Sequence, residues 1–195
     1  MKPVERDEVL SLSAYEPLRE AFRARVIAEK KRRRTRIGSK ISVVLENHDT
    51  VLLQIQEMLR TERISREGAV KHEIDTYNEL IAGKDQVSTT CMIEIEDKAE
   101  RDAFLKEALG LEEALTLRVG DHVAPAIGLP ERALEDRVSA VLYLKFQLPP
   151  AAVEYLKSTA SAAADLRFVA DHPAYRAETK LEPAVVESLK EDLFE

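Results

Sequence analysis

The sequence contains little cysteine, tryptophan or glycine. Its 195 residues include one cysteine, no tryptophan and six glycines, and aromatic residues make up only 5%. The single cysteine, Cys91, excludes an intramolecular disulfide and therefore a disulfide-stapled secreted domain. No stretch approaches the ~18 apolar residues of a membrane span, and the first residues lack the apolar run of a signal peptide. We therefore expect a soluble cytoplasmic protein that does not enter a membrane.

The motifs that usually mark catalysis are missing as well. There is no glycine-rich phosphate loop, and no serine lies in a G-x-S-x-G turn. The four histidines form no H-x-x-x-H or H-E-x-x-H pair, and none follows a glutamate by three positions. Hydrolase, nucleotide-dependent and intrinsic di-iron chemistry are therefore disfavoured. No cofactor is evident, and a bound metal ion is left open.

The start of the chain predicts a basic helix. Ser13 and Glu16 form an S-x-x-E capping box that opens it. An apolar stripe at helical spacing follows, made of Tyr15, Leu18, Phe22 and Val26. The helix is expected to continue through the segment KKRRRTR and to stop at Gly38. We expect residues 1–36 to form a helical arm and residues 37–195 to form a single domain.

The next segment predicts a β-hairpin followed by helices. Residues 41–45 alternate as a strand, residues 47–49 have turn composition, and residues 51–55 alternate again before a helix near Gln54. Ser65 is expected to cap a second helix, with an apolar stripe made of Val70, Ile74, Tyr77 and Ile81.

The rest of the chain mixes strands and helices. Strands are expected at 89–95, 115–119, 138–148, 166–170 and 176–181, and the apolar run 138–148 has the composition of a central strand. Asp97, Pro150 and Pro183 mark the starts of helices. Because the order shows no regular βαβ alternation, we expect an α+β fold with a mainly antiparallel sheet, an N-terminal basic helix and several packed helices.

Two histidines lie in turns that end expected strands. If these turns converge, they form a small acid/base or metal-binding cluster of Asp121, His122, Asp171, His172 and Tyr175. His72, with carboxylates three and seven positions later on the same helix face, is a weaker metal candidate beside His122 and His172. Ordinary turn chemistry and a solvated helix face explain the same residues.

Positive charge is concentrated near the N-terminus. Residues 19–40 hold ten basic and two acidic side chains, a net charge of +8, so the remainder carries −15. The candidate anion-binding residues are Lys30, Lys31, Arg32, Arg33, Arg34 and Arg36. The segment either meets an anionic partner or docks on acidic surface of its own or a sister chain. Nucleic-acid binding is disfavoured, because no aromatic residues are interleaved to stack bases and the remainder is acidic.

The segment QIQEMLRTER is unusually dense in pairing groups. Its candidate interaction or ion-pair residues are Gln56, Glu57, Arg60, Glu62 and Arg63. They indicate a surface ion-pair lattice, a docking face for a second chain, or a partly buried network that fixes the helix. Cys91, in an alternating apolar strand, is expected to be a buried, inert thiol.

Several phrases spread over the chain carry a resemblance to a known family. They are LSL-x-x-YE-x-x-R, ARVIAEKKRRR, QIQEMLRTERI, D-x-YN-x-LI, VGDH and DHPAYR. In this order they resemble an uncharacterised bacterial domain-of-unknown-function family, number 3501. Members of that family are commonly encoded beside rubrerythrin-type di-iron proteins and iron–sulfur oxidoreductases. The resemblance therefore implies an accessory role in iron, redox or peroxide-stress physiology.

These observations lead to one leading expectation and two alternatives. We expect an accessory protein that binds a protein partner, with a di-iron or iron–sulfur protein as the implied partner and a homodimer left open. The basic helix and the face around Gln56–Arg63 would be its contact surfaces. The alternatives are a metal-dependent enzyme or sensor that uses the His122 and His172 loops, and nucleic-acid binding through the basic segment.

Overall fold

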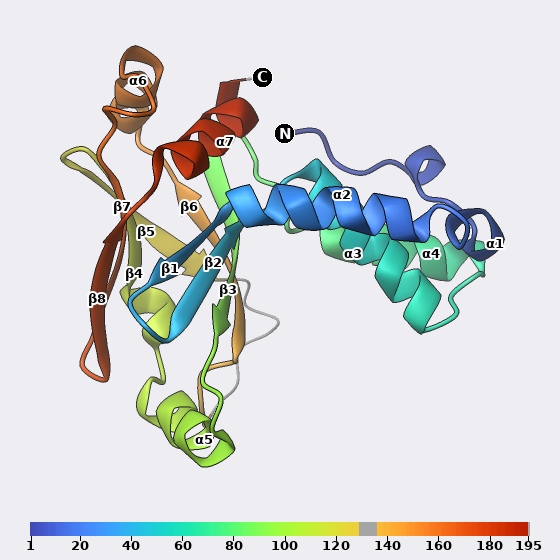
Figure 1. The fold of residues 1–195 in the computed structure, drawn as a ribbon, viewed down its shortest axis with the longest axis horizontal. Helices are drawn as coiled ribbons and strands as arrows, with labels where there is room; N and C mark the ends of the chain where they lie inside the picture. Colours follow the sequence, from blue (N-terminus) through green and yellow to red (C-terminus); the bar gives the residue numbers. More distant parts are fainter. Residues whose placement is uncertain (129–135, 195) are drawn as a thin grey trace.

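The computed structural model describes residues 1–128 and 136–194, which form a strongly curled sheet and a group of helices, the helical layer, that projects to one side of it (Figure 1). The N-terminal half contains η1 (Arg6–Glu8), α1 (Leu12–Tyr15), α2 (Arg19–Arg32), β1 (Arg34–Ile37), β2 (Ile41–Leu45), α3 (His48–Thr61), α4 (Glu67–Asn78) and β3 (Gln86–Ile93). The C-terminal half contains α5 (Lys98–Glu107), η2 (Leu111–Ala114), β4 (Leu115–Val119), β5 (His122–Gly128), β6 (Val141–Gln147), α6 (Pro150–Ser158), β7 (Leu166–His172), β8 (Tyr175–Lys180) and α7 (Pro183–Phe194).

The described strands form one eight-stranded sheet in the order β1-β2-β3-β6-β5-β4-β7-β8, and all neighbouring strands are antiparallel. The sheet curls until its two edge strands meet. The Tyr175 hydroxyl of β8 donates to the Ile37 carbonyl of β1 (2.6 Å) and accepts from the Lys40 N–H (3.1 Å). Gly38 makes the intervening turn with φ +60°, and a Cβ there would overlap the Tyr175 hydroxyl. The sheet therefore closes into a barrel-like shell.

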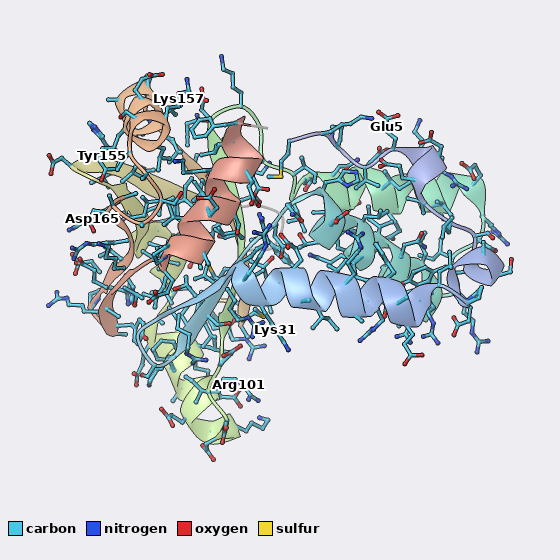
Figure 2. All side chains as sticks on the ribbon, turned by 45° about the horizontal axis from the view of Figure 1, so that its top comes forward. Glu5, Lys31, Arg101, Tyr155, Lys157 and Asp165 are labelled. Atoms are coloured by element: carbon cyan, nitrogen blue, oxygen red, sulfur yellow. The ribbon has the colours of Figure 1, made fainter. Side chains whose placement is uncertain are left out.

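The first hydrophobic core fills this shell. It includes Phe146 of β6 and Phe168 of β7, whose ring centroids lie 5.5 Å apart. Helix α5 covers one end of the shell, and α6 covers the other, beside α7 (Figures 1 and 2). Their apolar residues, such as Phe104, Leu156 and Leu189, belong to the same core.

The second core lies in the helical layer. It contains nine buried apolar residues from the N-terminal segment, α3, α4 and the turn after α4: Val4, Val9, Val51, Ile55, Leu59, Val70, Ile74, Leu80 and Ile81. Tyr143, on β6, packs against this core, and the Lys145 ammonium donates to the Ile81 carbonyl (2.9 Å). The helical layer thus contacts the sheet at β6.

The expected fold class and the central position of the strand in 138–148 are confirmed, since β6 lies between β3 and β5. The prediction of a basic helix that continues through KKRRRTR is wrong in part. The helix ends at Arg32, and residues 34–37 form β1, which pairs with β2 and buries Ile37. Residue 36, where we expected the arm to end, therefore lies inside the sheet. Ser11, rather than Ser13, caps the first helix.

The strand expected at 41–45 is confirmed as β2, but the hairpin turn and second strand expected at 47–55 are wrong. Asn47 is not a turn residue but the N-cap of α3, since its side chain accepts from the Thr50 N–H (3.0 Å) and the Thr50 hydroxyl accepts from the Asn47 N–H (2.8 Å). Val51, Ile55 and Leu59 recur every four residues and face the second core. The short run 51–55 fitted a strand and a helix equally well, and capping and packing selected the helix. No helix among the described residues is long and apolar enough to cross a membrane.

Candidate functional site

The two histidine turns do not converge. His122 at the start of β5 pairs with Val119, which pairs in turn with Leu166 of β7. His172 lies six residues further along β7, or about 20 Å at ~3.3 Å per residue. The predicted cluster of Asp121, His122, Asp171, His172 and Tyr175 is therefore divided between opposite ends of the sheet, and the hypothesis of one site is wrong.

His172 and Tyr175 act as structural links instead. The His172 Nε2 lies 3.1 Å from the Leu109 carbonyl, and its Nδ1 accepts from the Ala174 N–H (3.1 Å). This arrangement places the proton of a neutral ring on Nε2. Tyr175 holds the closure of the sheet, and its ring meets Phe104 edge to face at 5.7 Å. Asp171 is exposed and pairs with Arg176 (3.1 Å).

The other histidines are dispersed. Asp121 is exposed and His122 half-buried at the β4–β5 turn, whereas His72 is exposed on α4. His48 lies at the start of α3, 3.1 Å from Glu8. Within the described ranges, no three His, Cys, Asp or Glu side chains are grouped so that they could hold a metal ion. Cys91 is buried, which raises the pKa of its thiol to about 12.

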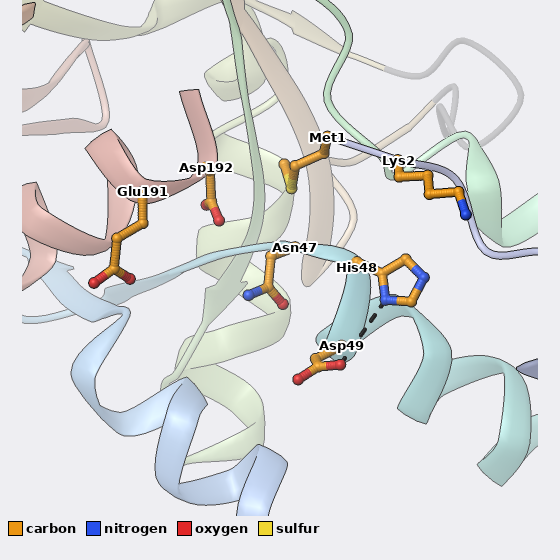
Figure 3. A pocket seen from close by; sticks show the side chains of 7 residues that line it. All are labelled: Met1, Lys2, Asn47, His48, Asp49, Glu191 and Asp192. Atoms are coloured by element: carbon orange, nitrogen blue, oxygen red, sulfur yellow. Dashed lines mark ion pairs between the residues drawn. The ribbon is translucent and has the colours of Figure 1, made fainter. Parts of the chain in front are cut away.

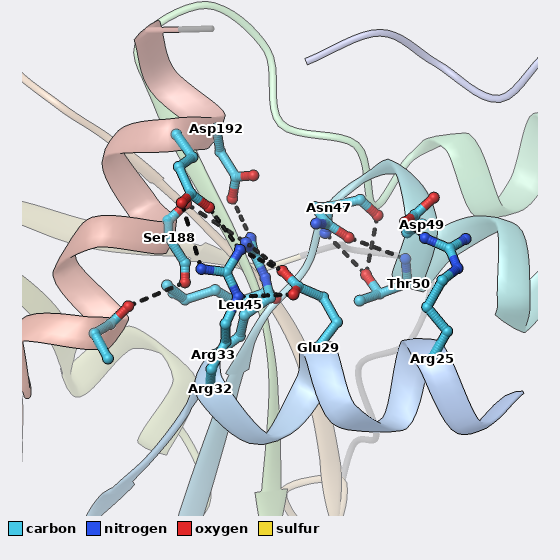
Figure 4. Close-up of polar contacts among 12 residues, drawn as sticks. Arg25, Glu29, Arg32, Arg33, Leu45, Asn47, Asp49, Thr50, Ser188 and Asp192 are labelled. Carbon is cyan, nitrogen blue, oxygen red and sulfur yellow. Dashed lines mark hydrogen bonds and ion pairs between the residues drawn. The ribbon is translucent and has the colours of Figure 1, made fainter. Parts of the chain in front are cut away.

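The basic segment docks on acidic surface of its own chain (Figure 4). Arg32 pairs with Glu29 and Glu191 (2.7 and 2.6 Å), and Arg36 pairs with Glu94 (2.7 Å). Arg34 lies 3.8 Å from the same Glu94. Of the six predicted anion-binding residues, Lys30 is half-buried and Lys31 is exposed at the end of α2.

Arg33 is the buried member of that segment. Its side chain is 1% exposed and donates to the Leu45 carbonyl (3.0 Å), and it pairs with Asp192 of α7 and with Glu29. Burial raises the pKa of Asp192 to about 6, although the neighbouring Arg33 opposes that shift. Arg33 thus joins α2, β2 and α7 and is inaccessible to an external anion.

The dense pairing segment of α3 forms a network with the N-terminal helices. The Glu57 carboxylate accepts two hydrogen bonds from Arg19 (2.9 Å each), one from the Tyr15 hydroxyl (2.8 Å) and one from Arg23. The hydrogen bonds from Arg19 lower the pKa of Glu57 to about 2, and burial, together with the hydrogen bond to this anion, raises the pKa of Tyr15. The network therefore fixes α1 and α2 on α3.

The remaining predicted members of that segment behave differently. Gln56 is buried and contacts the backbone of Leu10, and Arg60 makes a two-bond pair with the exposed Glu16 (2.8 and 3.1 Å). Glu62 and Arg63 lie exposed at the C-terminal end of α3, where Arg63 has a φ of +53°. The segment thus divides into an inner network and an exposed end.

A polar cleft of about 380 Å³ opens between the two layers (Figure 3). Its lining residues are Met1, Lys2, Asn47, His48, Asp49, Glu191 and Asp192. The three carboxylates are paired with Arg25 and Arg32 of α2 and with Arg33, the residue that caps its C-terminal end. The cleft is therefore polar but close to charge balance.

A smaller hollow beside this cleft contains Glu46. This residue is 2% exposed, and its Oε1 accepts from the Thr90 hydroxyl (2.6 Å), while Oε2 has no hydrogen-bond partner among the described residues. The hollow, about 10 Å³, has room for roughly one water molecule. It can supply one hydrogen bond to Glu46, but it is too small for an organic substrate.

An apolar groove of about 190 Å³ lies on the helical layer. Its lining residues are Glu8, Leu10, Tyr15, Leu18, Phe22, Leu52 and Gln56. Leu18, a member of the predicted apolar stripe, is 54% exposed, and Leu10 is 37% exposed. The sequence contained no signal for this groove, because its walls come from segments about 40 residues apart.

Residues 3–193 match a protein family described as a protein of unknown function, DUF3501. The chain is also similar to a solved structure, described as a novel protein of unknown function from Burkholderia pseudomallei K96243. The two chains share 35% sequence identity with a TM-score of 0.90, over 98% of this chain and 100% of the other. No protein with a curated description matches.

Proposed function

From the premise that the chain belongs to the DUF3501 family of proteins of unknown function, we propose that it is an accessory protein that binds a partner protein through its helical layer. The observation that carries this proposal is the apolar groove beside Leu18. The docking surface is this groove together with the outward face of α2.

The groove has the size and chemistry to accept an apolar side chain. A cavity of ~150 Å³ lined by apolar side chains accepts a benzene-sized group, and this groove measures about 190 Å³. Tyr15, Phe22 and Leu52 provide most of an apolar lining, and Gln56 and Glu8 add polar groups at its edge. Apolar pockets of this kind accept the anchor residues of binding partners.

The walls of the groove are held in place without a partner. Tyr15 and Arg19 are fixed by the Glu57 carboxylate, and Phe22 meets Tyr15 edge to face with centroids 6.3 Å apart. A preformed site reduces the ordering that binding would require. The hydrogen-bond network around Glu57 therefore holds the walls of the groove that we propose as the docking surface.

The outward face of α2 suits a partner helix. Ala21, Ala24 and Ala28 are exposed along it, so a helix can approach closely, and the exposed Lys31 lies at its C-terminal end. A partner with apolar anchors and an acidic residue near that end fits this surface. We propose a di-iron or iron–sulfur protein as this partner and peroxide stress as the setting. That choice is supported by the family resemblance alone.

A capture experiment with matched variants tests the proposal. The tagged full chain, Leu18→Glu and Val123→Glu would each be incubated with a purified rubrerythrin-type protein and with an iron–sulfur oxidoreductase. Leu18 and Val123 are equally exposed (54% and 52%), but Val123 lies on β5 of the sheet. We expect the wild-type chain and Val123→Glu to retain an iron-containing partner and Leu18→Glu to lose it. Equal retention by both variants would contradict the proposed surface.

The two alternatives are not proposed further. A metal-dependent site at His122 and His172 required the two turns to meet, and they lie at opposite ends of the sheet. Phosphate binding by the basic segment is disfavoured, because Arg33 is buried and Arg32, Arg34 and Arg36 contact carboxylates of the same chain.

A further inference from the structure

The first ten residues form an extended strap that crosses α3 and α4 (Figures 1 and 2). Apart from the single turn of η1, it contains no regular secondary structure. Val4 and Val9 of this strap are 2% and 4% exposed and belong to the second core, whereas Glu5 and Asp7 between them face solvent. The helical layer therefore holds an extended segment through two apolar positions five residues apart.

Two amide side chains recognise the backbone of the strap. Asn78, at the end of α4, accepts from the Val4 N–H and donates to the Val4 carbonyl, both at 2.9 Å. Gln56 of α3 makes the same pair of bonds with Leu10, at 2.6 Å to the N–H and 3.3 Å to the carbonyl. Each amide thus satisfies one residue's donor and acceptor, as a neighbouring strand would.

Two side-chain contacts, an ion pair and a contact with a histidine, lie between these clamps. Arg6 makes a two-bond pair with Glu67 at the start of α4 (2.7 and 2.9 Å). Glu8 meets His48 at the start of α3 (3.1 Å). Between the two buried valines, the surface of α3 and α4 therefore contacts one basic side chain, Arg6, and then one acidic side chain, Glu8.

We infer that this surface of α3 and α4 is a binding groove for a peptide segment with a single helical turn, occupied in this structure by the chain's own strap. The occupant that it fits is a segment of a partner protein with the pattern of residues 4–9: an apolar β-branched residue, a basic residue two positions later, an acidic residue, and a second apolar β-branched residue. Because the amides recognise backbone groups, the other positions are free to vary.

The strap is suited to exchange. It buries two valine side chains and is otherwise held by side-chain contacts, so it can open without unfolding the sheet. As a tethered ligand it competes at high effective concentration, and an external segment binds only as the strap leaves. Glu8, Leu10 and Gln56 also form part of the apolar groove, so the test relies on the Asn78 clamp, which lies outside that groove.

The test uses the full chain and a fluorescent peptide, MKPVERDEVLSL, with the sequence of residues 1–12. Val4→Asp puts a charge into a buried position and releases the strap. We expect the peptide to bind Val4→Asp about tenfold more tightly than the wild-type chain, because the tethered competitor is gone. The exposed strap variant Glu5→Ala should bind it as weakly as the wild-type chain.

The groove itself is tested by adding Asn78→Ala to Val4→Asp. Asn78→Ala should lower the affinity for the peptide about tenfold, whereas Leu18→Glu in the same Val4→Asp background should leave the affinity unchanged. The Leu18→Glu result separates this inference from the proposed docking surface. Equal peptide binding by Val4→Asp and the wild-type chain, or no effect of Asn78→Ala, would overturn the inference.

Hydrogen exchange on the wild-type chain provides a measurement that does not depend on a variant folding. The clamped N–H groups of Val4 and Leu10 should exchange faster than those of β3, because the strap opens locally. If they exchange only together with β3, the strap leaves only on global unfolding and the inference fails. If the wild-type chain forms a dimer and Val4→Asp does not, the groove binds the strap of a second copy. That result would overturn the proposal that it binds a segment of a partner protein.

Discussion

The curled sheet and the helical layer are held together in different ways. The sheet encloses a continuous apolar core, and its hydrogen bonds run between backbone groups of neighbouring strands. The helical layer has a core of nine apolar residues and relies on side-chain contacts, chiefly the Glu57 network and the Asn78 and Gln56 clamps.

This difference shows where the molecule can change. A closed apolar core resists local opening, because any opening exposes many buried side chains to water. Side-chain clamps and ion pairs can be exchanged for equivalent contacts with another molecule at small net cost. The exposed groove and the strap both lie in the helical layer, so both proposals place binding there.

Substitutions in the core of the sheet should lower the free energy of unfolding the most. Phe146→Ala removes a side chain that is 1% exposed and packs against Phe168, so we expect a loss of about 3–5 kcal/mol of unfolding free energy. Val123→Ala, on the exposed face of β5, should change it by less than about 0.5 kcal/mol. Denaturant unfolding followed by circular dichroism measures both. Similar losses would mean that the sheet interior is not the dominant core.

Substitution of Arg33, which joins the helical layer to the sheet, should have the second largest effect on the free energy of unfolding. Arg33→Met leaves Asp192 buried without its cation and the Leu45 carbonyl without its donor, so we expect a loss of about 3 kcal/mol. Arg34→Met, whose side chain is 47% exposed, should cost at most about 1 kcal/mol. The same unfolding measurement applies. A small effect of Arg33→Met would show that the two layers are joined mainly by apolar contact.

The Glu57 network should give a smaller, pH-dependent effect. Glu57→Gln at pH 7 should cost about 2 kcal/mol, because charged hydrogen bonds from Arg19 are lost. The folded pKa of Glu57, about 2, lies below its ordinary value of 4.5. Its stabilisation is therefore present above pH 4.5 and is lost as the pH falls towards 2. Unfolding curves between pH 2 and 7 should converge for wild type and Glu57→Gln at the acid end. Glu62→Gln, at the exposed end of the same helix, should follow the wild type throughout.

The smallest expected difference in stability is between substitutions in the two histidine turns. His172→Ala removes contacts with the Leu109 carbonyl and the Ala174 N–H, so we expect a loss of about 1 kcal/mol. His122→Ala, in a half-buried turn at the other end of the sheet, should change stability by less than about 0.5 kcal/mol. Thermal unfolding of both variants measures the difference. A larger effect at His122 would reverse our assignment of structural roles.

Much of the fold followed from local patterns, and the candidate site did not. The strands β3, β4, β6, β7 and β8 and the helices α5, α6 and α7 were predicted near their observed positions, because alternation, capping residues and prolines mark them locally. Strand β5 was missed, since Pro125 and small residues interrupt its alternation. Its pairing with β4 and β6 compensates for that weak local preference.

The candidate contacts depended on residues far apart in sequence. Asn78 meets Val4 across 74 residues, and Arg33 meets Asp192 across 159. No periodicity within one segment reports such pairs. The histidine turns were chosen because strand ends often carry function, but the register of β7 against β4 decides which ends meet.

The sequence by itself determined the α+β class, most of the elements and the concentration of charge in residues 19–40, because these depend on neighbouring residues and on composition. Tertiary structure alone decided that the basic segment satisfies acidic groups of its own chain, that β1 closes the sheet, and that Leu18 stays exposed. The physical reason is that pairing and burial depend on which distant surfaces meet, and that is settled only when the sheet curls and the helical layer docks on it.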